Sequence, residues 1–218
     1  MTSHKFFTAR HLRAATIAGL ASAALALSGC NAGGSPGGTD TSPAAVSQTP
    51  TATASPTPSP TSTPAYVPAS ASGRAQNVPV PVLPDVGKTE TKEGLEAFAR
   101  YWYATLSYAY ETGDTQKLDT LSESYCVFCR GLSDGVAAAW ADGRWISGGK
   151  VETPAVSAVV VPGEKAYATI QVLQQAVEIR KPDGALYQEP TKATNAGSRA
   201  DATFGPSGWV ISDLGLIR

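Results

Sequence analysis

The hydrophobic periodicity of the chain changes at Gly149, and this change constrains the fold more than any other feature. Between Thr91 and Gly143 apolar side chains recur every three to four residues, which is typical of amphipathic helices. Beyond Gly149 β-branched and apolar residues alternate with polar ones, which is typical of half-buried strands. Helices followed by strands predict an α+β domain, with the N-terminal helices packed on one face of a curved antiparallel sheet.

Three helices are expected before Gly149. Thr91 suits the N-cap of a first helix that extends to Thr112, and Gly113 suits its C-cap. A short second helix is expected over 115–121, and a third begins near the cysteine pair and ends at Asp142. Helical spacing predicts the buried stripes of the first and third helices: Leu95, Phe98, Trp102, Leu106 and Ala109, and Cys129, Leu132, Val136 and Trp140.

The part of the chain after Gly149 predicts a series of antiparallel strands. The expected strands are Ala155–Val161, Lys165–Arg180, Ala185–Glu189, Ser198–Phe204 and Trp209–Ile217. The second of these is long for a strand, so a bend or bulge is expected within it. Residues 195–197 are expected to lie in a loop.

The first 30 residues have the pattern of a secretory leader. A basic stretch precedes an uncharged Ala- and Leu-rich run, residues 14–27, which is too short to span a membrane comfortably. The run ends in Leu-Ser-Gly-Cys at residues 27–30, which resembles the lipobox of bacterial lipoproteins. The resemblance implies removal of residues 1–29 and diacylation of Cys30. The acyl chains would then attach the protein to the outer face of the cytoplasmic membrane.

Residues 31–84 consist mainly of Ser, Thr, Pro, Ala and Gly, and they contain 11 of the 16 prolines. A segment of this composition buries too little apolar area to offset its ordering entropy, so it is predicted to be a disordered tether. Residues 85–218 contain all four tryptophans and are long enough for one hydrophobic core. The predicted organisation is therefore a leader over 1–29, lipidated Cys30 and tether over 30–84, and one domain over 85–218.

Loss of the leader would change the chemistry available to the chain. It removes His4 and His11, so no Ser-His-Asp triad, Cys-His dyad or imidazole metal ligand is left. It also removes three of the 17 basic side chains and none of the 18 acidic ones, which leaves 14 against 18. A chain without a basic tract is not expected to bind nucleic acid. No cofactor and no metal are predicted.

Cys126 and Cys129 form a C-x-x-C pair within the stretch YCVFCRGL. A helix N-terminus lowers a thiol pKa, as in redox motifs, but the thioredoxin fold needs a β-α-β unit, and helices precede this pair. A structural zinc site needs four ligands, and the chain offers no second pair and no retained His. An even pair in an oxidising compartment favours a disulfide. We expect a local staple that fixes the start of the third helix.

The order of three helices and a meander is similar to the nuclear-transport-factor-2-like cone fold. Residues 88–218 also resemble a family of actinobacterial cell-envelope lipoproteins of unknown function. The resemblance lies in AFARYWYATLSYAYETGD, the cysteine pair, DGRWISGG and GWVISDLGL. The cone resemblance implies an opening between sheet and helices. Five aromatic residues are expected either to line this opening or to fill the core: Tyr101, Trp102, Tyr108, Trp140 and Trp145.

The predicted function is that of a non-enzymatic module that binds a small ligand or an envelope protein through its concave side, with no catalytic residues assigned. Two alternatives stay open. A thiol–disulfide oxidoreductase would use Cys126 as nucleophile and Cys129 as resolving thiol. A cone-fold isomerase-type enzyme would move a proton with an Asp and a Tyr, for which Asp142, Asp213 and Tyr167 are the candidates.

Overall fold

The computed structural model describes residues 64–161 and 166–217. The predicted leader, the predicted lipidation site Cys30 and most of the predicted tether lie outside the described residues. No helix among the residues that the structure describes is both long and apolar enough to cross a membrane.

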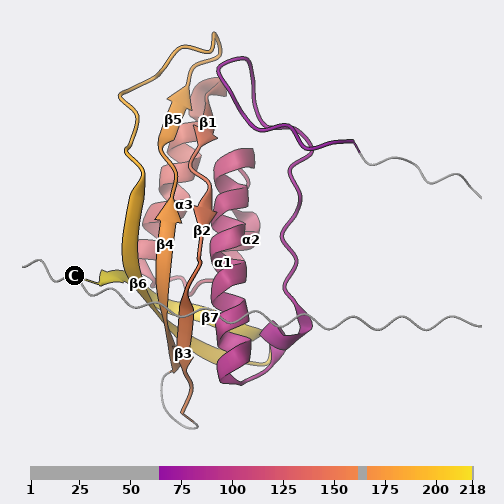
Figure 1. The fold of residues 1–218 in the computed structure, drawn as a ribbon, viewed down its shortest axis with the longest axis vertical. Coiled ribbons are helices and arrows are strands. Elements are labelled where there is room, and N and C mark those ends of the chain that lie inside the picture. Colours follow the sequence, from indigo (N-terminus) through magenta and orange to yellow (C-terminus); the bar gives the residue numbers. More distant parts are fainter. Residues whose placement is uncertain (1–63, 162–165, 218) are drawn as a thin grey trace, which may run out of the picture. The chain divides into compact units, whose positions relative to one another are not determined.

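Helices occupy the first half of the described chain (Figure 1). They are, in order, η1 (Asp85–Lys88), α1 (Lys92–Thr112), α2 (Gln116–Thr120), α3 (Val127–Trp140) and η2 (Ala141–Gly143). The predicted caps of α1 are confirmed. Thr91 Oγ1 accepts a hydrogen bond from Gly94 N at 3.0 Å, and Gly113 follows the helix with a φ of 77°. Glycine tolerates this left-handed conformation best. The third helix ends two residues earlier than predicted, and Asp142 lies in η2.

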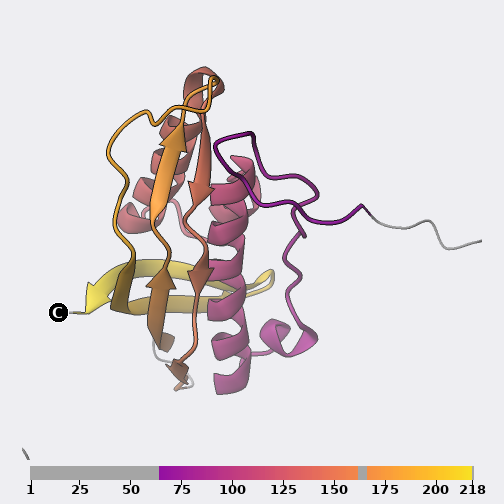
Figure 2. The ribbon, with the colours of Figure 1, turned by 45° about the horizontal axis from the view of Figure 1, so that its top comes forward.

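The second half of the chain forms two antiparallel sheets. The strands are β1 (Trp145–Gly148), β2 (Val151–Glu152), β3 (Val156–Val159), β4 (Ala166–Gln174), β5 (Val177–Arg180), β6 (Thr194–Gly205) and β7 (Gly208–Ile217). The larger sheet has the order β2-β4-β6-β7, with β3 also paired to β4, and β1 pairs with β5 in the smaller one. Figure 2 shows β7 crossing the direction of β3, so the larger sheet is strongly curved. The predicted α+β class is confirmed.

The expected bend within the long strand is present and separates β4 from β5. After Gln174 the chain leaves the larger sheet, and β5 pairs with β1 instead. Gly148 and Gly149 lie opposite this point with φ values of 77° and 73°. Gly149 N donates a hydrogen bond to Ala176 O at 2.8 Å. Two consecutive residues with positive φ turn the neighbouring strand sharply, which explains why both sheets break at the same level.

Two predictions in the strand region are wrong. Residues 185–189 are irregular, with one bridge between Leu186 and Arg180, and do not form a strand. Residues 195–197, predicted to be a loop, belong to β6, where they pair with β4. Their small and polar side chains gave no strand signal, and the pairing is supplied by the neighbouring strand.

Helix α1 packs against the inner face of the larger sheet. Its own buried residues include Leu95, Phe98 and Trp102, each at most 1% exposed. The facing strand positions are small: Ala158, Ala166, Ala168, Ala200 and Ala202, all buried. Small side chains leave room for the large ones of α1, and burial of each large side chain contributes about 1.5–3 kcal/mol.

Residues 64–84 were predicted to be tether, yet they are packed on the domain. Val67 and Gln76 pair through two backbone hydrogen bonds of 3.0 and 2.9 Å. At the tip of this hairpin, Ser70 O accepts a hydrogen bond of 3.0 Å from the indole of Trp145. The hairpin is therefore fixed both within itself and to β1.

Arg74 fixes the same hairpin at a second point. Its Nη2 donates a hydrogen bond of 2.9 Å to Gly143 O, and its guanidinium carbon lies 5.1 Å from the ring centroid of Trp140. Both partners belong to the end of the third helical region, far along the chain. The hairpin precedes the predicted domain boundary at Pro84, and these contacts join it to the described part of the fold.

Candidate functional site

A cavity of about 230 Å³ lies between α1, α3 and the inner face of the larger sheet; we call it the α1–α3 cavity. Its walls are Tyr103, Leu106 and Tyr110 from α1, Phe128 and Leu132 from α3, and Val151, Val172, Gln174, Thr194, Ala196 and Leu216 from the strand region. None of these lining residues carries a charged side chain. A concave, mostly apolar site with a few polar groups is the usual form of a small-molecule site.

Regular periodicity places these side chains around the cavity. On α1, Tyr103, Leu106 and Tyr110 are separated by three and four residues, so they share one face of the helix. On β4, Val172 and Gln174 alternate in the same register as the buried Ala168 and Ile170, which places them on the inner face. The cavity thus lies beyond the small inner side chains of the sheet, at strand positions that the side chains of α1 do not cover.

Two tyrosines supply most of the polar character of the cavity. The hydroxyl of Tyr103 donates to Ser198 Oγ at 2.8 Å, and Ser198 in turn donates to Gly215 O at 3.0 Å. Burial raises the pKa of Tyr103 to about 12, although the hydrogen bond with Ser198 acts in the opposite direction. Burial also raises the pKa of Tyr110, against the effect of a hydrogen bond with Gln174. Both phenols therefore stay protonated at neutral pH and act as neutral hydrogen-bonding groups.

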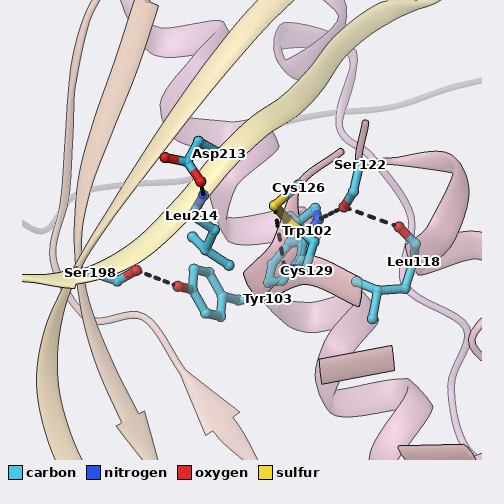
Figure 3. The surroundings of a disulfide bond; sticks show 9 residues. All are labelled: Trp102, Tyr103, Leu118, Ser122, Cys126, Cys129, Ser198, Asp213 and Leu214. Atoms are coloured by element: carbon cyan, nitrogen blue, oxygen red, sulfur yellow. Dashed lines mark hydrogen bonds between the residues drawn. A yellow bond between two sulfur atoms is a disulfide. The ribbon is translucent and has the colours of Figure 1, made fainter. Parts of the chain in front are cut away.

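The predicted disulfide between Cys126 and Cys129 is present at the start of α3 (Figure 3). Cys126 is the N-cap residue, and its Sγ accepts a hydrogen bond from Cys129 N at 3.3 Å. The two residues are only 1% and 3% exposed and belong to the hydrophobic core. The bridge therefore holds the first turn of α3, which carries the cavity residue Phe128, against the domain.

Trp102 lies beside the disulfide (Figure 3) and is not among the residues that line the cavity. Its Nε1 donates to Ser122 Oγ at 2.9 Å, and Ser122 donates to Leu118 O at 3.4 Å. This chain of hydrogen bonds satisfies the indole N–H inside the core, as a buried tryptophan requires. It also connects α1 to the segment that precedes α3.

Of the five aromatic residues that we expected either around the opening or in the core, Tyr101 and Trp102 belong to the core and Trp145 is also buried. Trp140 donates its indole N–H to Tyr110 O at 3.1 Å, and Trp145 anchors the N-terminal hairpin. Tyr108 is half-buried on α1, and Tyr101 lines a different groove. None of the five lines the α1–α3 cavity. Tyr103 and Tyr110, which do line the cavity, were not predicted as site residues, although the helical spacing of positions 103, 106 and 110 is visible in the sequence.

The three residues considered for proton transfer also lie away from the cavity. Asp142 forms an ion pair of 3.1 Å with Arg144 in the exposed η2 region. Tyr167 lies under the guanidinium of Arg199, 3.7 Å from its carbon, on the outer face of β4. Asp213 is exposed on β7 and accepts a hydrogen bond from the next residue's amide. Their positions give no shared site.

A larger groove of about 820 Å³ runs between residues 81–88, α2 and the β6–β7 turn. Tyr101 and Phe98 form its floor, while Val82 and Pro206 on its sides are exposed. Because its walls are themselves in contact with solvent, this groove is less enclosed than a typical ligand site. Among the residues that the structure describes, no cluster of three or more His, Cys, Asp or Glu is placed to hold a metal ion.

Comparison with known proteins identifies a family but no activity. The model of a family of unknown function, DUF6318, matches residues 64–215, which include the N-terminal hairpin and both sheets. No curated protein shows significant sequence similarity to the chain.

Several solved structures are similar in fold. The intermembrane space region of the chloroplast protein ARC6 matches with 13% identity and a TM-score of 0.45, over 58% of this chain and 96% of that one. Aln2 from a Streptomyces species matches with 10% identity and a TM-score of 0.39, over 57% and 90% of the two chains. An uncharacterized protein with a cystatin-like fold from Caulobacter vibrioides matches with 12% identity and a TM-score of 0.35, over 55% and 89%. These similarities concern the fold alone.

Proposed function

The chain belongs to the DUF6318 family of unknown function, and we propose that it is a lipid-anchored extracytoplasmic binding protein that holds a small apolar ligand in the α1–α3 cavity. The observation that carries the proposal is the composition of that cavity, which combines apolar walls with neutral hydroxyl and amide groups. Its volume of about 230 Å³ is below the roughly 300–1,000 Å³ typical of sites for drug-sized ligands. The site therefore suits one apolar group, such as the end of an alkyl chain or a single ring.

The same composition favours binding over proton transfer. General acid–base catalysis needs a side chain whose pKa lies near the working pH. The tyrosines in the wall have pKa values raised by burial, that of Tyr103 to about 12, so they do not act as bases at neutral pH. The isomerase alternative needs an Asp beside a Tyr, but Asp142 and Asp213 both lie away from the tyrosines of the cavity.

Burial of the disulfide supports a structural role over the oxidoreductase alternative. Thiol–disulfide exchange requires that an attacking thiolate reach a sulfur atom. Cys126 and Cys129 are 1% and 3% exposed, and both pack in the core. We therefore assign the bridge to fixing the first turn of α3 at the cavity.

The location of the protein is proposed from the lipobox-like sequence at residues 27–30. Acylation of Cys30 would hold the domain at the outer face of the cytoplasmic membrane. Replacing Cys30 by Ser is expected to lower the fraction of the protein that is recovered with membranes and to release part of it into the soluble secreted fraction. Equal membrane association of wild type and Cys30→Ser would contradict the proposed anchor.

Ligand binding can be tested with the neutral fluorophore N-phenyl-1-naphthylamine, whose phenyl group is the single ring expected to enter the cavity. The chain used lacks residues 1–30 and keeps every described residue. We expect a saturable rise in fluorescence that 1-decanol displaces. Ala196 is half-buried in the cavity wall, where it pairs with Val172 on the neighbouring strand, so Ala196→Phe should fill the cavity and weaken dye binding by about tenfold or more.

The matched control is Ala104→Phe, which adds the same ring at an exposed position of α1. It should leave dye binding unchanged. Circular dichroism should show the same folded spectrum for both variants. Dye binding that is absent in the wild type, or equally strong in Ala196→Phe, would refute the proposed site.

A further inference from the structure

We propose that an apolar rim beside the α1–α3 cavity docks the domain on a lipid bilayer, and that the ligand is the alkyl chain of a lipid that enters from that surface. The rim consists of Tyr125, Val127, Phe128 and Leu216. This inference rests on the proposed function, because it names the class of ligand for the same cavity. It adds a membrane contact made by the folded domain itself, independent of Cys30.

The rim exposes large apolar side chains in one place. Tyr125, Val127, Phe128 and Leu216 are 63%, 71%, 39% and 60% exposed. Single exposed apolar residues are ordinary on a protein surface, but a group of neighbours usually marks a contact site. Three of the four come from one short stretch, and the fourth joins them because Phe128 and Leu216 line the same cavity.

The fold keeps these side chains outside at a cost. The disulfide and the N-cap turn Cys126 and Cys129 into the core, which leaves Val127 on the surface and Phe128 partly exposed at the edge of the cavity. A turn that buried one of them would gain hydrophobic stabilisation. The disulfide therefore holds apolar side chains on the surface, where they do not contribute to the core.

Rim and cavity are continuous, and this points to a bilayer as the occupant. Phe128 and Leu216 are at once cavity wall and exposed surface. An alkyl chain that passes between them would stay in an apolar environment from the bilayer to Tyr110 and Val172. Tyr125 beside them has the amphipathic ring that is enriched at the level of lipid headgroups.

The predicted anchor would keep the rim close to a bilayer. Residues 31–63 separate Cys30 from the first described residue, and the predicted tether over these 33 residues would span about 30 Å. Tethering at that distance raises the effective concentration of lipid near the domain. A rim of low intrinsic affinity is then enough to dock the domain on the bilayer. The rim residues carry no charge, so the contact does not require anionic lipids.

The test is flotation of the chain lacking residues 1–30 with an excess of phosphatidylcholine vesicles. The double variant Tyr125→Ser, Val127→Ser replaces the two most exposed of the four rim residues without changing a residue that lines the cavity. We expect the wild type to float with the vesicles and the double variant to float at least about fivefold less. The matched control is Val80→Ser, because Val80 is 68% exposed and lies outside the rim. It should float like the wild type.

The outcomes separate this inference from the proposed function. A chain that does not float, or a double variant that floats as well as the wild type, overturns the rim proposal. If dye binding remains sensitive to Ala196→Phe, the cavity proposal then stands alone. A rim-dependent dimer in sedimentation velocity, without flotation, would show that a second copy covers the rim and also overturns the proposal. Rim-dependent flotation without any dye binding would support membrane docking and refute the ligand site.

Discussion

Replacing Arg74 by Ala is expected to release the N-terminal hairpin from the domain. The side chain donates a hydrogen bond of 2.9 Å to Gly143 O and a longer one of 3.5 Å to Arg144 O, and its guanidinium carbon lies 5.1 Å from the Trp140 ring centroid. A hydrogen bond contributes about 1 kcal/mol net, and an exposed cation–π contact about 0.5–1 kcal/mol. The free energy of docking should therefore fall by about 1.5–2 kcal/mol, which corresponds to roughly tenfold more frequent opening.

The Trp145 indole reports this opening directly, because its N–H donates to Ser70 O in the hairpin. Hydrogen exchange of the indole, followed by NMR, should be roughly tenfold faster in Arg74→Ala than in the wild type. The matched control is Arg199→Ala, which removes an arginine stacked on Tyr167 on the outer face of the sheet. It should leave indole exchange unchanged. Unchanged exchange in Arg74→Ala would refute the assignment of residues 64–84 to the folded domain.

Further predictions concern turns, titration, the bridge and the core. Gly184→Ala should speed exchange of the same indole, because the added Cβ would lie 2.2 Å from Ala71 O at a φ of 84°. Tyr103 contributes stability below pH 10 that is lost as pH rises towards 12, because its pKa is raised in the folded chain only. Tyr103→Phe should therefore reduce the alkaline fall in unfolding free energy by about 1.4 kcal/mol per pH unit. Replacing both bridge cysteines by Ala should cost only about 2 kcal/mol in urea unfolding, since the closed loop is short. Ile170→Ala, at a fully buried site, should cost about 2–5 kcal/mol, and equality with the exposed Val159→Ala would contradict the core assignment.

The helices were predictable because their signals are local. Thr91 and Gly113 act as caps through contacts within four residues, and the apolar stripe of α1 follows from its own spacing. The cysteine bridge was likewise predictable from its spacing and the expected compartment. These features depend on neighbouring residues, so the sequence alone specifies them.

The errors arose where distant residues decide the structure. The Pro- and Ser-rich composition of residues 64–84 predicts a tether, but Trp140 and Trp145 provide binding surfaces for that segment. Similarly, residues 195–197 look like a loop and become strand because β4 offers backbone partners. In both cases the stabilising contact is tertiary, and no local pattern records it.

The candidate site was predictable in kind but not in its residues. The order of elements resembles the cone fold, and this resemblance predicted an opening between sheet and helices. Which residues line the opening depends on how α1 is rotated about its axis, and the sequence does not specify that rotation. Trp102 faces the disulfide and the core, while Tyr103, one position further along the helix, faces the cavity. A rotation of about 100° per residue separates these two roles, and both positions are aromatic.

The central claim is that an apolar ligand occupies the α1–α3 cavity, and methyl NMR tests it most directly. In a Leu- and Val-labelled chain, 1-octanol should shift the methyl signals of Leu132, Val172 and Leu216, which line the cavity. The methyl signals of Val80 and Val159, which lie outside it, should not move. Saturable shifts confined to the first group would support the account. Shifts that are absent, or that appear equally in both groups, would contradict it.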